Sequence, residues 1–140
     1  MILDYTGATQ LAIVQALLNT ARNGGAWNGN GITSATAGAN AVHNTTLGAM
    51  EATEFKSIYG AAALFDGFTI DTTAVLVKYT YYGDADFNGK VNFDDYVRTD
   101  SGFNNHLNHW INGDYDGNGQ VNFDDYVLID LAFNTQSGTL

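Results

Sequence analysis

Apolar residues recur every three or four positions in two stretches of the N-terminal half, and this spacing predicts two helices. The first helix is expected over residues 8–22 and the second over residues 47–59. The spaced apolar residues are Leu11, Val14, Leu17 and Leu18 in the first stretch, and Leu47, Met50, Ala52, Phe55 and Ile58 in the second. Asn23-Gly24-Gly25 should end the first helix, because glycine readily adopts the left-handed conformation found at helix C-termini.

Residues 75–82 have the two-residue period of a β-strand, which predicts that Val75, Val77, Tyr79 and Tyr81 share one face. Residues 2–5 can pair beside this strand. Residues 23–40 are rich in Gly, Asn, Ser, Thr and Ala, a composition typical of a long loop. We therefore expect residues 1–82 to form a small α+β module of two helices and a short sheet.

The C-terminal half contains one segment twice. Residues 83–97 read GDADFNGKVNFDDYV, and residues 113–127 read GDYDGNGQVNFDDYV. When residues 83–105 are aligned with residues 113–135, 15 of the 23 positions are identical. Each copy contains the spacing D-x-D-x-N-G-x-V-N-F-D-D, which is that of a twelve-residue calcium loop. The repeat therefore predicts two metal sites of one kind.

Calcium prefers six to eight oxygen ligands, and such a loop supplies them from alternate residues. Side chains at loop positions 1, 3, 5 and 12 are expected to bind the ion directly, position 7 through its carbonyl, and position 9 through a water molecule. In that order the residues are Asp84, Asp86, Asn88, Asp95, Lys90 and Asn92 in the first loop, and Asp114, Asp116, Asn118, Asp125, Gln120 and Asn122 in the second. At position 8, Val91 and Val121 can make a short strand contact between the loops.

Two interpretations other than calcium loops exist for this segment. Asp, Asn and Gly are common turn formers, and Asn-Gly pairs occur in hairpins. Two copies with every ligand position filled in the same register favour metal loops over turns alone. Magnesium is the lesser alternative, because it gives up its waters reluctantly and takes fewer protein ligands. Two calcium ions are therefore the expected cofactors.

The repeat resembles a dockerin. It follows the pattern G-D-x-[DN]-x-[DN]-G-x-[VI]-N-x-x-D, continues into one helix and then repeats, with Asp95 and Asp125 at position 12 as in type I dockerins. The resemblance implies that residues 83–140 form a mainly α, duplicated EF-hand-like pair. It also implies a non-catalytic, calcium-dependent module that attaches a larger secreted or surface protein to a cohesin-like partner.

The same resemblance indicates where a partner would bind. Dockerins contact cohesin from loop positions 10 and 11, at the start of each helix, where Ser-Thr is frequent. Here these positions are Phe93 and Asp94 in the first copy, and Phe123 and Asp124 in the second, so the partner need not be cohesin itself. Arg98, on the first helix, is a further expected contact.

Residues 75–96 also resemble the stretch that joins an uncharacterised module to a dockerin-like pair in large secreted planctomycete proteins. This second resemblance implies the C-terminal region of a larger protein. Met1-Ile2-Leu3-Asp4 has neither the basic region nor the apolar core of a signal peptide, so a secreted protein would carry its leader on a longer precursor. An extracellular or cell-surface location is expected.

Composition narrows the possible partners. The chain has 140 residues, no cysteine and a formal net charge of −10, with ten of its fifteen acidic residues in the repeat half. This charge excludes nucleic acid as a natural partner, because nothing would neutralise the phosphates. No apolar run is long enough for a membrane span. No catalytic residues are expected, because the one paired set, Glu51 and Glu54, is more typical of a solvated helix face.

The duplication predicts that the two units pack about a pseudo-twofold axis with antiparallel helices. Phe93, Tyr96, Val97 and Phe103 are expected to match Phe123, Tyr126, Val127 and Phe133 in a shared core. The second helix is apolar on more than one face and is expected to be the more buried one. Two function classes remain: an attachment module, which would expose an apolar strip on a repeat helix, and a calcium-rigidified structural terminal domain, which would bury both helices.

Overall fold

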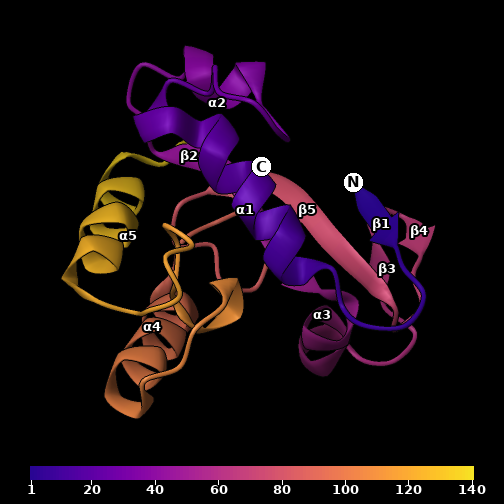
Figure 1. The fold of residues 1–140 in the computed structure, drawn as a ribbon. Helices are drawn as coiled ribbons and strands as arrows, with labels where there is room; N and C mark the ends of the chain where they lie inside the picture. Colours follow the sequence, from indigo (N-terminus) through magenta and orange to yellow (C-terminus); the bar gives the residue numbers. More distant parts are fainter.

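The computed structural model describes residues 1–140 and has the α+β architecture that was predicted (Figure 1). Its strands are β1 (Ile2–Asp4), β2 (Thr45–Glu51), β3 (Leu64–Phe65), β4 (Phe68–Thr69) and β5 (Ala74–Tyr81). Its helices are α1 (Leu11–Arg22), α2 (Ala35–Ala39), α3 (Ala52–Tyr59), α4 (Phe93–Asn105) and α5 (Phe123–Thr135), with 3₁₀ turns at Asn23–Gly25 and Trp110–Asn112. None of the helices combines the length and the apolar character needed to cross a lipid bilayer.

The centre of the fold is a three-stranded antiparallel sheet with the order β1-β5-β2. Leu76 of β5 pairs with Ile2 on one side and with Met50 on the other, so the predicted pairing of the N-terminal residues is confirmed. α1 lies across one face of the sheet, where Val14 and Leu18 pack with Val75 and Val77 (Figure 1). Residues of β5 that alternate with these, such as Leu76, face the opposite side.

The stretch 47–59 is not one helix, as its apolar spacing had predicted. Residues up to Glu51 form β2, and the helix begins only at Ala52. The apolar positions at the start of this stretch fit both the helical and the strand period. Residues 45–51 form a strand because they pair with β5 along the whole length of β2. The change of structure is sharp because Glu51 and Glu54 form a capping box, in which the Glu51 N–H donates to Glu54 Oε2 at 2.9 Å.

The stretch 23–40 also differs from the single long loop expected of it. It contains α2, whose first turn is capped by Ser34, since the Ala37 N–H donates to Ser34 Oγ at 3.1 Å. The side chain of Trp27 is buried beside this short helix with Ala21 and Ala37. The expected end of α1 is confirmed, because Asn23 adopts the left-handed conformation there.

One hydrophobic cluster continues across the predicted boundary between residues 82 and 83. It joins Met50, Phe55 and Leu76 of the N-terminal half to Trp110 and Ile129 of the repeat half. The backbone of β2 lies close to the Trp110 ring at Gly48. A Cβ at this position would lie 2.7 Å from the ring, so glycine allows this contact between the two halves. The alternation had predicted Tyr81 on the same face as Val75 and Val77, and this is wrong: Tyr81 belongs to this cluster, whereas Val75 and Val77 pack with α1. The repeat half is therefore packed directly onto the far face of the sheet.

Candidate metal centre

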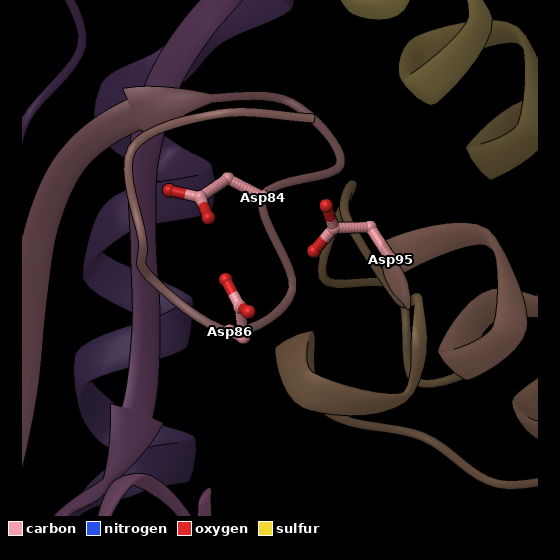
Figure 2. Close-up of side chains that lie close together, drawn as sticks. All are labelled: Asp84, Asp86 and Asp95. Atoms are coloured by element: carbon pink, nitrogen blue, oxygen red, sulfur yellow. The ribbon is translucent and has the colours of Figure 1, made fainter. Parts of the chain in front are cut away.

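The strand β5 leads directly into the first acidic loop, and the loop ends in the first turn of α4. Asp84 and Asp86 come from the loop, and Asp95 comes from α4. One carboxylate oxygen of each residue lies within 4.8 Å of a carboxylate oxygen of each of the other two. Figure 2 shows the three side chains close together, with Asp84 and Asp86 on the loop and Asp95 reaching toward them from the start of α4. All three residues are buried, so a cluster of negative charge lies inside the protein.

The second loop brings together the corresponding residues. Asp114 and Asp116 of the loop and Asp125 of α5 also have carboxylate oxygens within 4.8 Å of one another. Asp114 and Asp125 are buried, whereas Asp116 is partly exposed. The two triads are thus equivalent in composition and spacing, but the second is more open to solvent.

The carboxylate at position 12 is oriented by backbone N–H groups in both loops. Asp95 Oδ1 accepts from the Ala85 N–H at 2.8 Å, and its Oδ2 accepts from the Asn92 N–H at 2.8 Å. Asp125 repeats the pattern with the N–H groups of Tyr115 at 2.7 Å and Asn122 at 2.9 Å. Each bond ties the start of the helix to the loop before it, so the third carboxylate of each triad is held against the other two.

One carboxylate oxygen in each loop has no hydrogen-bond partner although it is buried. These atoms are Asp84 Oδ1 and Asp114 Oδ1, which occupy the same position in the two loops. The other oxygen of each side chain is satisfied, since the Gly89 and Gly119 N–H groups donate to Oδ2 at 2.9 and 3.0 Å. A buried unpaired carboxylate oxygen is costly, and a cation is the group that would compensate it. The hard oxygen donors of both triads therefore fit a divalent metal ion.

Burial also makes these carboxylates difficult to ionise without a cation. Desolvation raises the pKa of Asp84 and the pKa of Asp95 to about 7, and raises the pKa of Asp114 to about 6. The pKa of Asp125 is raised as well, again mainly by burial. Neighbouring carboxylates of the same triad raise all four pKa values further, whereas backbone N–H groups lower them. A bound cation would favour the ionised forms.

The other residues expected as ligands have hydrogen bonds of their own within the loops. The Asn88 amide donates to Asp86 Oδ2 at 2.9 Å and its oxygen accepts from the Lys90 N–H, and Asn118 repeats this with Asp116 and Gln120. The side chains of Lys90 and Gln120 are exposed, which leaves only their backbone carbonyls for a ligand role. Asn92 and Asn122 serve as N-caps of α4 and α5, accepting from the N–H groups of Asp94 and Asp124. This capping role was not predicted.

The predicted strand contact between Val91 and Val121 does not form. Instead, the side-chain amide of Gln136 bonds both to the Val91 N–H, at 2.8 Å, and to the Val91 carbonyl, at 2.7 Å. The Leu140 N–H donates to the Gly89 carbonyl at 3.0 Å. The chain after α5 therefore takes the place beside the first loop that the second loop was expected to occupy.

The two repeat helices contact each other through their aromatic side chains. The rings of Tyr96 and Phe133 are 5.7 Å apart, and those of Phe103 and Tyr126 are 5.8 Å apart. Each contact joins the beginning of one helix to the end of the other, so the helices are antiparallel, as predicted. A shift of thirty residues converts one contact into the other, which is the relationship expected of a pseudo-twofold axis.

The shared core predicted between these helices is wrong for several residues. Phe93 is 78% exposed and Phe123 is 75% exposed, and Val97 and Val127 are exposed as well. The prediction that α5 is the more buried helix is also wrong, because each helix buries one residue per turn on the same three positions. These are Asp95, Thr99 and Gly102 in α4, and Asp125, Ile129 and Ala132 in α5. Of the additional apolar residues of α5, Ile129 and Ala132 are buried where α4 has Thr99 and Gly102, whereas Leu128 is half-buried and Leu131 is exposed.

Residues outside the repeat complete the first site. The hydroxyl of Thr80, on β5, donates to Asp84 Oδ2, and the indole N–H of Trp110 donates to the Asp84 carbonyl at 2.7 Å. Neither residue belongs to the loop motif, and no local pattern would have identified them. The second loop instead borders a cavity of about 600 Å³ between α1, β2 and the turn that contains His109.

In comparisons with known proteins, no family model, no curated protein and no solved structure matched this chain. The assignment of the two acidic triads therefore depends on their own chemistry and geometry.

Proposed function

We propose that this protein is a non-catalytic, dockerin-like calcium-binding module that binds two calcium ions and attaches a larger extracellular protein to a protein partner. One observation carries the metal assignment. Asp84 Oδ1 and Asp114 Oδ1 are buried without a partner at the same position of two loops, each inside a triad of carboxylates. The unpaired oxygen is therefore a shared property of the two loops, and a cation bound within each triad would compensate it.

Calcium is favoured over magnesium by the number of oxygens that each loop offers. Three carboxylates, the amide oxygen of Asn88 or Asn118, a backbone carbonyl at Lys90 or Gln120 and a water-mediated contact reach the lower end of the six to eight ligands that calcium takes. Magnesium retains several waters and is usually bound by one or two carboxylates, so it needs fewer of these groups. Outside the cell calcium is plentiful, and sites with dissociation constants of about 10⁻⁴–10⁻³ M are sufficient there.

An attachment role is supported by the exposed apolar residues at the start of both repeat helices. Phe93 and Val97 on α4 have their counterparts Phe123 and Val127 on α5, and all four are exposed. Residues four apart on a helix are neighbours, so each pair forms a contiguous apolar strip, and exposed strips of this kind mark interaction sites. Asp94, Asp124 and the half-buried Arg98 flank these residues and would add polar contacts. A structural terminal domain would have buried both helices, so the alternative is less well supported.

Calcium titration by calorimetry tests the metal assignment. We expect two sites in the wild-type protein, one in Asp84→Ala and one in Asp114→Ala. Asp4→Ala, which removes an exposed carboxylate outside both loops, is the matched control and should retain two sites. Magnesium should compete only weakly. Fewer than two sites in the wild-type protein, or tighter binding of magnesium than of calcium, would contradict the proposal.

The attachment role needs a separate experiment. A purified cohesin domain and a secreted-protein extract should each be passed over the immobilised chain, with calcium and with chelator. Partner binding should require calcium and should be lost in Phe93→Ser/Phe123→Ser. Phe68→Ser removes a 66% exposed phenylalanine from β4 and should leave binding unchanged. Calcium binding without any calcium-dependent partner would favour the structural terminal domain.

A further inference from the structure

The fourth position of each metal loop contacts the N-terminal half of the chain. This position is Phe87 in the first loop and Gly117 in the second, and both residues have a positive φ, of 64° and 70°. Neither residue is a metal ligand in the loop pattern. Their contacts, however, differ completely, and together they join residues 1–82 to both candidate metal sites.

In the first loop the side chain of Phe87 makes the contact. It is buried, and its ring centroid lies 6.1 Å from that of Trp110 and 6.3 Å from that of Phe65. The Phe87 carbonyl accepts a hydrogen bond from Nζ of Lys78, on β5, at 2.8 Å. The backbone between Asp86 and Asn88 is therefore held by the sheet.

In the second loop the backbone itself lies against α1. The Gly117 carbonyl accepts from the Asn19 amide at 2.8 Å, and the Asp116 carbonyl accepts from the Arg22 guanidinium at 2.9 Å. A Cβ at Gly117 would lie 2.2 Å from the Gln15 amide nitrogen, so a larger residue here would force the Gln15 side chain to move. The replacement of Phe87 by Gly117 between the two repeats thus matches what each loop packs against.

We propose that Lys78 and Asn19, with Arg22, are positioning residues for the two metal sites, and that the N-terminal half is therefore part of the metal-binding unit. The inference depends on the proposed calcium function and deepens it. Lys78 and Asn19 hold the carbonyls that follow Asp86 and Asp116, and Arg22 holds the carbonyl of Asp116 itself, so each loop is held in its binding conformation before the ion arrives. Preorganisation of this kind increases affinity by reducing the cost of ordering the loop.

The electrostatic effect of Lys78 has the opposite sign, which makes the inference testable. A positive charge near a cation site weakens binding, so its removal alone should strengthen the binding of calcium. If positioning dominates, Lys78→Met should weaken the first site in spite of this. Lys56→Met is the matched control, because Lys56 Nζ also donates to a backbone carbonyl, that of Ile70 at 2.6 Å, but touches neither loop. It should leave calcium affinity unchanged or slightly increased.

The experiment measures calcium affinity in full-length variants in which one of the two sites has been removed, and the test substitutions are added to these variants. Asp84→Asn leaves the second site, and Asp114→Asn leaves the first. We expect Asn19→Ala to weaken the second site about fivefold and to leave the first unchanged, since one hydrogen bond is worth about that factor. Lys78→Met should weaken the first site and leave the second unchanged. Asn105→Ala, whose amide donates to the Ser101 carbonyl within α4, is the control for Asn19→Ala.

Circular dichroism at saturating calcium separates loss of positioning from loss of folding. If Asn19→Ala does not fold, Arg22→Met tests the same loop through a different hydrogen bond. Equal affinities in the Asn19 and Lys78 variants and their controls, with two sites present in the wild-type protein, would overturn this inference alone. Absence of calcium binding in the wild-type protein would instead overturn the proposed function.

Discussion

The hydroxyl of Tyr96, on α4, donates a hydrogen bond to Asp130 Oδ1, on α5, at 2.5 Å. The reciprocal bond joins Tyr126 of α5 to Asp100 of α4. Asp95 and Asp125 lie in the first turns of these same helices, so the pair of bonds joins the two helices that complete the acidic triads. The bonds lie at the surface, so each should contribute modestly to stability.

Loss of these hydroxyls should therefore destabilise the repeat half by similar amounts. We expect Tyr96→Phe and Tyr126→Phe each to lower the free energy of unfolding by about 0.5–1.5 kcal/mol, as for one hydrogen bond. Urea unfolding in saturating calcium measures the change. Tyr59→Phe, at the exposed end of α3, is the control, and losses no larger than in this control would contradict the expectation.

Removal of calcium should destabilise the protein strongly. Each saturated site adds about 2.7 kcal/mol at a hundredfold excess over its dissociation constant. Thermal melts followed by circular dichroism should therefore shift to lower temperature in chelator, with loss of helical signal. The variant Asp84→Ala/Asp114→Ala should melt at the same temperature with and without chelator. An unchanged wild-type melt in chelator would refute the prediction.

The metal-free protein should become less stable as the pH rises from about 4 to about 7. The pKa of Asp84 and that of Asp95 are raised to about 7 by burial, whereas an unfolded aspartate titrates near pH 3.9. The folded state therefore binds more protons than the unfolded state in this range, and its stability decreases with increasing pH. Urea unfolding of calcium-stripped protein at a series of pH values measures this slope.

Asp84→Asn is the control for the pH dependence, because an amide does not titrate. Its slope between pH 4 and 7 should be shallower than that of the wild-type protein. Saturating calcium should reverse the trend, since the ion binds the ionised carboxylates and displaces their protons. A wild-type slope equal to that of Asp84→Asn would show that this carboxylate does not have a raised pKa.

The contact between Gly48 and Trp110 can be tested by a single added methyl group. A Cβ at Gly48 would lie 2.7 Å from the indole ring and 2.8 Å from the Phe87 ring. We expect Gly48→Ala to lower the free energy of unfolding by about 1–3 kcal/mol, as for other overpacked cores. In the Trp110→Phe background the additional loss should be smaller, because the smaller ring leaves room. Additive losses would contradict this contact.

The two acidic triads could be predicted from the sequence because each of them is almost entirely local. Asp84, Asp86 and Asp95 lie within twelve consecutive residues, so their spacing alone brings them to one point once the loop closes. The same locality explains why α4 and α5 could be predicted, since each helix directly follows its loop. α1 and β5 have clear periods and were also predicted.

Features that depend on distant parts of the chain were not predicted correctly. Residues 47–51 have an ambiguous period, and only pairing with β5 makes them a strand. The burial of α5 was overestimated because apolar composition does not say which residues meet a neighbouring element. Gln136 replaced Val121 as the partner of Val91 because a side-chain amide can satisfy both backbone groups at once.

The sequence by itself determined the two acidic loops, the class of metal that they suit and the duplication that relates them. These depend on the order of residues within a loop and on the coordination chemistry of carboxylates. The tertiary structure alone decided that Lys78 and Asn19 contact the loops, and that Phe93 and Phe123 remain exposed. These contacts depend on how the first loop packs on β5 and how the second loop packs on α1. Each joins two separate elements of the fold, and the residue spacing within a single element does not predict how two elements pack.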